Sequence, residues 1–447
     1  MSDLRGLASS ALLSTAGIGV QGVSRLLYTV LIGRAFGTEQ LGHASALLSL
    51  SIFAALLWPT AAGNTASRFL ALALRGRVSD TSVVRALDVS LLVSCGLLGL
   101  VAVPIARSLG NSWATSATAA ALVAGYGAYA YARGARLGYG GAARVALWDS
   151  VSALVSLGLL VAVCVGGLSA LVVLPMAVGY AVFAVASWPR RAPVPGPATT
   201  TESDVEPAPS GRVDLDADAA AAATVSAALS FSRWNVLAGL TTNGLLQLAM
   251  IAAQVNSPGQ DAGVYAAAFT LATPASMLGQ AVSQIVVPAF AHDTGRSPLR
   301  SRGPVVACTA FALLAAVVFG LAALLAPWYL PLLYPAEAEA AVPMLRFLLL
   351  GVFVFTVALL PAALLLAAGR SRPVALTSSG GFVVGLVVIV ATSGSLGVSA
   401  GTLGFTVGSV ITLVALVVLA VGRPGPRTGL ETVAGPGAGG AATSSPT

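Results

Sequence analysis

The sequence predicts an all-α polytopic membrane protein with about 12 transmembrane helices in two six-helix lobes, and three observations support this fold class. Of its 447 residues, 57% are hydrophobic and only 9% are charged, whereas a soluble domain carries about 25% charged residues. Apolar runs long enough to cross about 30 Å of hydrocarbon recur along the chain. The basic residues, all of them arginine, fall almost entirely between these runs.

Twelve apolar segments meet the requirement of about 20 residues for a membrane-crossing helix. Residues 1–188 hold the first six as an N-terminal lobe, and residues 228–421 hold the other six as a C-terminal lobe. Residues 189–227 are rich in Pro, Ala, Thr and acids, which predicts a disordered cytoplasmic linker, and residues 422–447 predict a disordered cytoplasmic tail. The predicted spans are 9–33, 41–63, 86–106, 114–132, 145–166, 168–188, 228–254, 262–290, 304–326, 342–367, 374–394 and 397–421.

Arginine placement predicts the orientation, because basic residues concentrate in the cytoplasmic loops of membrane proteins. With the N-terminus in the cytoplasm, Arg34 and Arg107 fall outside, three of the 23 arginines lie within spans, and all the others are cytoplasmic. A shift of one span in the register destroys this asymmetry. Both termini are therefore predicted to be cytoplasmic.

Six spans in each half give the two halves the same orientation, as in transporters that are built from parallel repeats around a central site. A gapless alignment of Gly42–Phe69 with Gly263–Phe290 matches six of 28 positions, including both end residues. This similarity is faint, but it agrees with a parallel pseudo-repeat.

The composition excludes several classes of function. Cys95, Cys164 and Cys308 lie far apart within apolar runs, and the chain has only two histidines, so we expect no disulfide, metal site or cofactor. We attribute the net charge of +7 to membrane topology and not to nucleic-acid binding. Because the predicted external loops are short, we expect no catalytic domain and no enzymatic activity.

Arg25, Arg233 and Arg346 lie within predicted spans, where a charged side chain costs about 2.5–3.5 kcal/mol on insertion scales. Arg25 shares one face of its helix with Gln21 and Tyr28, within an arc of roughly 60° at about 100° per residue. This polar stripe predicts the lining of a wet cavity. The alternative is an arginine that pairs with a carboxylate or with main-chain carbonyls between helices.

The seventh span, which is the first of the second half, repeats this arrangement. Arg233, Asn243, Gln247 and Gln254 fall within an arc of about 80°. Arg233 lies close to the cytoplasmic boundary, so a snorkelling side chain is the alternative to a substrate contact. For the deeper Asn243 and Gln247 the alternative is hydrogen bonding between helices.

Two further arginines have a weaker claim to a binding role. Arg68 lies at the cytoplasmic rim after the second span, a position that usually serves topology. Arg346 lies near the outer end of the tenth span, shortly after Glu337 and Glu339, which favours a structural pair.

Acids are nearly absent from the predicted spans. Asp88 and Asp149 lie close to cytoplasmic ends, and we expect them to pair there with the nearby Arg85 and Arg144. An interior that is cationic and poor in carboxylates suits an anionic headgroup better than a cationic drug or a metal ion. The fork of the arginine guanidinium suits phosphate or diphosphate oxygens in particular.

Prolines and glycines interrupt several spans and mark candidate bends, although both residues are common in membrane helices. The candidates are Trp58-Pro59, Pro274, Pro288, Pro361 and Gly380-Gly381.

Several short motifs resemble those of one transporter family. They are Ser24-Arg25-Leu26-Leu27, the turn Gly33-Arg34-Ala35-Phe36-Gly37 with Gly42 after it, Ala66-Ser67-Arg68-Phe69, a run from Gly263-Val-Tyr265 to Pro288, and Pro343-Met-Leu345-Arg346. With these motifs the chain resembles the polysaccharide-transport (Wzx-like oligosaccharide flippase) branch of the multidrug, oligosaccharidyl-lipid and polysaccharide (MOP) exporter superfamily.

The resemblance implies two six-helix lobes around a V-shaped cavity that the first and seventh helices line. It also implies a flippase in the cell membrane that moves a polyprenyl-(di)phosphate-linked oligosaccharide by alternating access. Its partners would be this anionic lipid-linked glycan, membrane lipids and glycan assembly proteins. Arg25, with Arg68 and Arg233, would hold the diphosphate, and Gln21, Asn243 and Gln247 would meet sugar hydroxyls.

Other functions stay open at this stage. A MATE-like drug or cation antiporter of the same superfamily usually needs a buried carboxylate, and none is evident in the sequence. Lipid II flippases share a similar Ser-Arg-x-Leu motif but usually have fourteen helices. A membrane glycan polymerase or a non-transporting assembly scaffold is the remaining alternative.

Overall fold

The computed structural model describes residues 2–73, 80–189, 213–273, 302–367 and 370–422, and these residues are almost entirely helical, with no strand among them. In the N-terminal half the elements are α1 (Ser2–Phe36), α2 (Thr38–Leu57), α3 (Pro59–Ala73), α4 (Asp80–Ser108), α5 (Trp113–Gly138), α6 (Ala142–Val165), the short 3-10 helix η1 (Ser169–Leu171) and α7 (Leu174–Ser187).

The C-terminal half is built in the same way. Its elements are α8 (Val213–Gly239), the π-helix η2 (Leu240–Gly244), α9 (Leu245–Asn256), the helical residues 260–273, α11 (Arg302–Leu333), α12 (Ala338–Ala367), α13 (Ser371–Leu396) and α14 (Ser399–Val421). Within the described residues, nine helical segments are long and apolar enough to cross a membrane. The predicted fold class, a multi-pass helical membrane protein, is confirmed.

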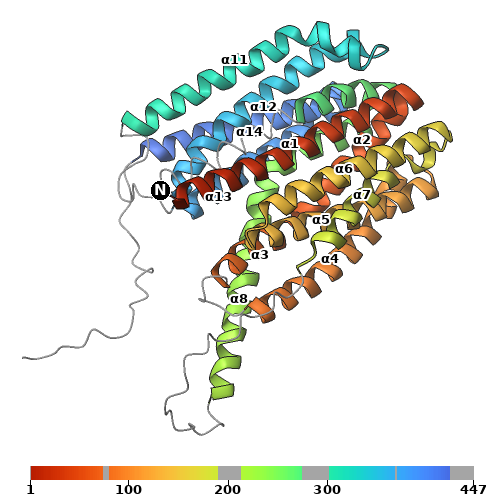
Figure 1. Ribbon diagram of the computed structural model, residues 1–447. Coiled ribbons are helices and arrows are strands. Elements are labelled where there is room, and N and C mark those ends of the chain that lie inside the picture. Colours follow the sequence, from red (N-terminus) through yellow and green to blue (C-terminus); the bar gives the residue numbers. More distant parts are fainter. Residues whose placement is uncertain (1, 74–79, 190–212, 274–301, 368–369, 423–447) are drawn as a thin grey trace, which may run out of the picture.

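The helices form two groups, which we call the N-lobe (α1–α7) and the C-lobe (α8–α14). In the N-lobe α1 packs on α6, and α5 packs on α3, α4 and α7 (Figure 1). In the C-lobe α14 packs on α12 and α13, and α11 packs on α12. Figure 1 shows α1 running beside α2 between the two groups, while α8 crosses below them at a steep angle.

Local sequence explains where several helices end. Gly37 separates α1 from α2 with a φ of 84°, a backbone conformation that residues other than glycine rarely adopt. The predicted bend at Trp58-Pro59 is confirmed, because α2 ends at Leu57 and α3 begins at Pro59, where the missing N–H costs no helical hydrogen bond. The Ser112 hydroxyl caps α5 by accepting a bond from the Thr115 amide at 3.1 Å.

Other candidate bends have different outcomes. α12 runs through Pro361 without a break, and α13 runs through Gly380 and Gly381. Pro274 and Pro288 lie outside the described residues. The interruption that the sequence does not announce is η2, where one π-helical turn joins α8 to α9.

The predicted linker 189–227 is shorter than expected at its C-terminal end. α8 begins at Val213, so residues 213–227 are helical and not a linker. Five alanines follow one another from residue 219, and alanine has the highest helix propensity of the amino acids. The aspartates that precede them favour a helix N-terminus. Residues 190–212, and the predicted tail after residue 422, lie outside the described residues.

The two lobes meet along α2, which packs against α9, and along α3, which packs against α8. A Cβ atom placed on Gly42 would lie 2.9 Å from the backbone nitrogen of Gly263, so the two backbones nearly touch. These glycines are the paired first residues of the internal alignment. Equivalent residues meet each other where a two-fold axis passes, so this contact agrees with a pseudo-repeat.

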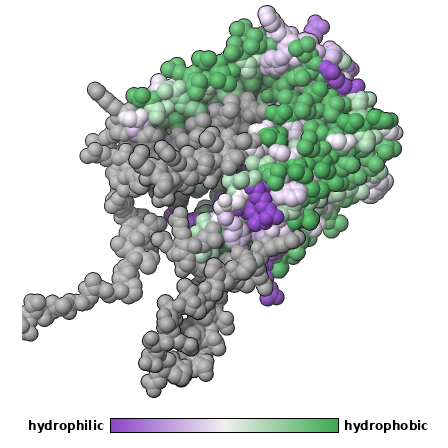
Figure 2. All heavy atoms as spheres, in the orientation of Figure 1, coloured by the Kyte–Doolittle hydropathy of each residue, from purple (hydrophilic) through white to green (hydrophobic). Residues whose placement is uncertain are grey.

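The surface of the helices is largely apolar, as expected where lipid surrounds a protein. Figure 2 shows a broad hydrophobic surface with hydrophilic residues gathered near its ends. In α11, large side chains such as Leu313, Val317 and Leu324 are more than half exposed. These helices therefore present to the bilayer the face that a soluble protein would bury.

Candidate functional site

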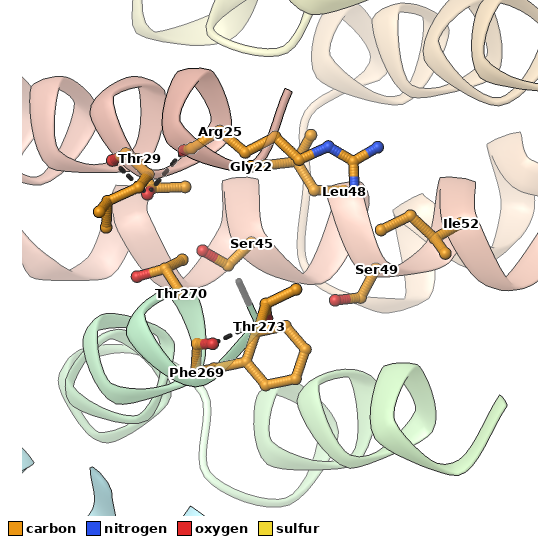
Figure 3. Close-up of a pocket in the computed structure, with 11 residues that line it drawn as sticks. Gly22, Arg25, Thr29, Ser45, Leu48, Ser49, Ile52, Phe269, Thr270 and Thr273 are labelled. Atoms are coloured by element: carbon orange, nitrogen blue, oxygen red, sulfur yellow. Dashed lines mark hydrogen bonds between the residues drawn. The ribbon is translucent and has the colours of Figure 1, made fainter. Parts of the chain in front are cut away.

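A cavity lies between the lobes, and the space inside it together with its open mouth is about 450 Å³. Residues from α1 and α2 form one side, and residues from 260–273 form the other (Figure 3). The lining residues are Gly22, Arg25, Leu26, Thr29, Ser45, Leu48, Ser49, Ile52, Phe269, Thr270 and Thr273.

Arg25 is the charged residue of this lining. Its Nε and Nη2 atoms donate to the Tyr180 hydroxyl at 2.9 and 2.7 Å. Its guanidinium carbon lies 5.0 Å from the ring centroid of Tyr126 and 5.8 Å from that of Tyr180, within the range of cation–π attraction. Both tyrosines are neutral, and within the described residues Arg25 has no ion pair. The positive charge is therefore held in place by aromatic rings without being neutralised.

Hydroxyl groups surround the rest of the cavity. Thr29, Ser45, Ser49, Thr270 and Thr273 come from three different helices. The hydroxyls of Ser45 and Ser49 are buried and have no hydrogen-bond partner within the described part of the chain. An unsatisfied buried hydroxyl costs about 1–3 kcal/mol, so these groups are positioned to bond to a polar ligand or to water.

The cavity has two chemically different ends. In Figure 3 the Arg25 side chain extends along the cavity toward Leu48 and Ile52, while Thr29 and Thr270 lie at the other end. Because Thr29 is one helical turn beyond Arg25 on a helix that runs outward in the predicted orientation, the threonines mark the outer end.

Gln21 and Tyr28 are predicted to share the cavity with Arg25, but the structure directs both side chains into the N-lobe. Gln21 Nε2 donates to the main-chain oxygen of Asp149 at 2.9 Å. The buried Tyr28 hydroxyl donates to the Val172 carbonyl and accepts from the Met176 amide at 3.3 Å. Both therefore fix α1 against its neighbours, and neither lines the cavity.

Arg68 and Arg233 lie apart from the cavity lining. Arg68 is exposed on α3, with its guanidinium carbon 4.5 Å from the ring centroid of Phe231 in α8. Arg233 is also exposed, two residues further along α8. The structure thus brings Arg68 to the α3–α8 contact between the lobes, whereas Arg233 projects from another face of α8, about 200° around the helix from Phe231.

The polar residues of the seventh span occupy the seam between α2 and α9. Asn243 lies in η2 and donates to the Thr242 hydroxyl at 3.2 Å. Gln247 and Gln254 are buried in α9, and the Oε1 atom of each lacks a partner within the described residues. Gln254 Nε2 lies 3.4 Å from His43 Nδ1 on α2. None of the three lines the cavity.

Arg346 does not form the predicted structural pair with Glu337 or Glu339. Its Nε atom donates to the Ala323 carbonyl of α11 at 3.1 Å, and the side chain is exposed. Glu337 instead accepts a hydrogen bond from Thr38. The Ala323 carbonyl of α11 is within reach of Arg346. It can accept this bond because Pro327, four residues further along the helix, has no N–H to donate to it.

The pairing predicted for the two intramembrane acids is wrong. Asp149 is fully buried and pairs with Arg133 of α5 at 3.4 Å, and it accepts from the Tyr129 hydroxyl at 2.9 Å. Asp88 accepts from the Tyr131 hydroxyl at 2.6 Å. The predicted partners were neighbours in sequence, whereas the actual donors project from the adjacent helix α5.

A second cavity lies inside the C-lobe beside η2. It has about 440 Å³ of empty space and hydroxyl groups from Thr241, Ser378, Ser409 and Thr412 on its lining. The structure describes no group of three or more His, Cys, Asp or Glu side chains close enough together to hold a metal ion.

No protein-family model matches the sequence, and no curated protein matches it. Solved structures do match its fold. The lipid II flippase MurJ in an inward closed conformation has a TM-score of 0.68 at 10% identity, covering 91% of this chain and 87% of that chain. An inward-facing multidrug resistance MATE transporter of the MOP superfamily has a TM-score of 0.58 at 15% identity, covering 91% and 92%.

The chain shares this fold. A MATE protein in complex with MaL6 also matches, with a TM-score of 0.56 at 14% identity over 92% of this chain and 94% of that chain. The coverage includes both lobes, so the similarity extends over the whole architecture. The predicted likeness is thus confirmed at the level of the fold, whereas membership of the superfamily and of its polysaccharide branch stays a prediction.

Proposed function

We propose that this protein is a flippase of the cell membrane that moves a polyprenyl-(di)phosphate-linked oligosaccharide between the two faces of the bilayer. The observation that carries the proposal is the uncompensated Arg25 in the cavity between the lobes. A guanidinium that tyrosines hold, and that has no ion pair within the described residues, keeps its charge available for an anion. Its planar fork matches phosphate oxygens in a bidentate geometry.

The remaining lining supports an amphiphilic substrate. Thr29, Ser45, Ser49, Thr270 and Thr273 offer hydroxyls to sugar hydroxyls, and Leu26, Leu48, Ile52 and Phe269 offer apolar surface to the proximal isoprene units. Arg68 on α3 and Arg233 on α8, both exposed, supply positive charge on the cytoplasmic approach, where they attract an anionic headgroup.

The fold itself is compatible with drug and cation antiporters, since MATE transporters have it. A cation antiporter needs a carboxylate that can release its partner and bind the cation. The buried acid of the N-lobe, Asp149, is already paired with Arg133 and bonded by Tyr129. The cavity therefore presents a cation and not an anion, which favours the flippase over the antiporter.

The decisive experiment is mass spectrometry of polyprenyl-linked glycans extracted from the native host with and without this gene. We expect a lipid-linked oligosaccharide to accumulate in the deletion strain and to return to baseline with the wild-type gene. Arg25→Ala should fail to complement, with an accumulation within about threefold of the deletion, because a charged-group contact of about 1.5–3 kcal/mol is lost.

Arg346→Ala is the matched control, because it removes an exposed arginine that bonds only to a carbonyl. It should complement fully at equal protein abundance. Full complementation by Arg25→Ala would remove Arg25 from the mechanism. No accumulation in the deletion strain, together with a changed drug sensitivity, would favour the antiporter.

A further inference from the structure

We propose that residues 332–337, which are the end of α11 and its connection to α12, form a latch that closes the outer end of the cavity, with the Tyr334 hydroxyl as its central contact. The inference rests on the proposed function only in taking the cavity as the transport path. It assigns a gating role to residues that lie outside the cavity lining.

Tyr334 joins the two lobes directly above the cavity. Its hydroxyl donates to Thr29 Oγ1 of α1 at 3.2 Å and lies 3.0 Å from Thr270 Oγ1 of the C-lobe. Both threonines line the cavity, and Tyr334 is only 1% exposed. The phenol therefore occupies the space through which a ligand would leave between the threonines.

The backbone of α1 is shaped to accept this ring. A Cβ atom on Gly33, one turn beyond Thr29, would lie 3.2 Å from Tyr334 Cε1. That distance is tighter than an ordinary van der Waals contact, so a larger side chain would push the ring outward. Gly33 thus lets the ring of Tyr334 lie flat against the N-lobe.

Two further contacts hold the same segment to the N-lobe. The Arg34 guanidinium donates to the carbonyls of Leu332 and Leu333. Thr38 donates to the carboxylate of Glu337, which is 5% exposed. Thr29, Arg34 and Thr38 of the N-lobe therefore hydrogen-bond to one short segment of the C-lobe. Arg34 and Thr38 bind its two ends, and Thr29 binds Tyr334 between them.

The bonds of Thr29, Arg34 and Thr38 must break together if the lobes separate at the outer end, because each joins a residue of the N-lobe to residues 332–337 of the C-lobe. They are neutral or singly charged hydrogen bonds, which are individually weak. A few such bonds can hold a closed state and still release it on the timescale of transport.

The test measures how fast a reagent reaches the cavity from outside. Cys95, Cys164 and Cys308 are replaced by serine, and Ser45→Cys places a reporter thiol in the cavity lining, where the native residue is 2% exposed. Intact cells are treated with a membrane-impermeant maleimide. Tyr334→Phe should raise the labelling rate about two- to tenfold, since the hydrogen bond to Thr29 that joins the lobes is lost while the ring is kept.

Tyr329→Phe is the matched control, because Tyr329 lies in α11, five residues before Tyr334, and donates to the Ala322 carbonyl of its own helix at 3.0 Å. It should leave the labelling rate unchanged. Thr29→Val removes the N-lobe partner of Tyr334 and should raise labelling as Tyr334→Phe does, which guards against a folding defect in one variant.

Equal labelling in the Tyr334→Phe and Tyr329→Phe proteins would overturn the latch. Rapid labelling of Ser45→Cys with Tyr334 intact would also overturn it, because the outer end would then be open. The measurement needs no substrate, so a failure of the Arg25→Ala complementation test leaves its result readable.

Discussion

At the scale of single residues, the N-lobe contains a buried ion pair next to the site. Asp149 has no exposed side-chain surface, and Arg133 is 17% exposed. Gly17 of α1 lies so close that a Cβ atom there would be 2.6 Å from Asp149 Oδ2. Gln21 also bonds to the main chain of Asp149. The pair therefore anchors the helix that carries Arg25.

We predict that Asp149→Asn destabilises the protein by about 3–5 kcal/mol, because removing one member of a buried pair leaves the other charge uncompensated. The thermal midpoint of the detergent-solubilised protein should fall clearly below the wild-type value. The double variant Asp149→Asn, Arg133→Gln removes both charges and should recover most of the loss.

Asp261→Asn serves as the control, because Asp261 is exposed and lies on a helix that does not line this pair. It should leave the thermal midpoint within about 1 °C of the wild-type value, as expected of an exposed position. A midpoint for Asp149→Asn that matches the control would show that the pair does not stabilise α1.

The sequence identifies Arg25 but not its surroundings. An arginine in an apolar run stands out, because the cost of its burial requires an explanation. Helical periodicity gives the direction of a side chain about its own axis, but it does not name the neighbour on that side. The polar stripe of α1 lies at the border between the cavity and the interior of the N-lobe. Arg25 therefore reaches the cavity, while Gln21 contacts α6 and Tyr28 contacts the region around η1 and α7.

At the scale of elements, the glycines of α13 and α14 are packing sites and not hinges. α13 and α14 cross at two pairs of glycines spaced four residues apart, Gly381 with Gly385 and Gly404 with Gly408. A Cβ atom on Gly381 would lie 2.7 Å from the Gly408 carbonyl, and one on Gly385 would lie 2.7 Å from the Gly404 carbonyl. Small residues at this spacing let membrane helices approach closely.

We predict that Gly381→Ala destabilises the C-lobe by about 1–3 kcal/mol, because the added methyl group meets a backbone carbonyl that cannot rotate away. Gly380, the residue before Gly381, offers a matched control, since a Cβ atom on Gly380 would meet nothing within 4 Å. Gly380→Ala should keep the wild-type thermal midpoint or raise it. Equal midpoints for the two variants would contradict the close crossing.

Hydropathy predicts the spans well because the bilayer demands long apolar helices whatever their partners. The bend at Trp58-Pro59 is also readable, since proline blocks the continuation of a helix. The π-helix at Leu240–Gly244 is not. Its residues, Leu-Thr-Thr-Asn-Gly, include no proline, and the extra residue of the turn is accommodated by packing against α2 and α13, which the local sequence does not encode.

At the scale of the whole molecule, the described residues of the two lobes pack together along α2 and α9, and hydrogen bonds join the lobes in two further regions. One lies at α3 and α8, where the Thr65 and Ser232 hydroxyls are 2.7 Å apart. The other lies at the predicted outer end, where α1 and α2 meet residues 332–337. Few interlobe bonds and a polar cavity between them suit lobes that move as rigid bodies.

We predict that holding the lobes together at the outer end stops transport. In the cysteine-free protein, Thr38→Cys and Glu337→Cys place thiols at two hydrogen-bonded positions of different lobes, and a short bifunctional thiosulfonate reagent can bridge them. Lipid-linked oligosaccharide should then accumulate as in the deletion strain, and a reductant should restore the baseline, because the lobes can separate again.

The control pair, Asn256→Cys with Ser393→Cys, replaces side chains that are bonded at 3.1 Å within the C-lobe. Bridging this pair should leave transport unchanged, and transport that persists across a complete Thr38–Glu337 bridge would contradict rocking of the lobes at this end.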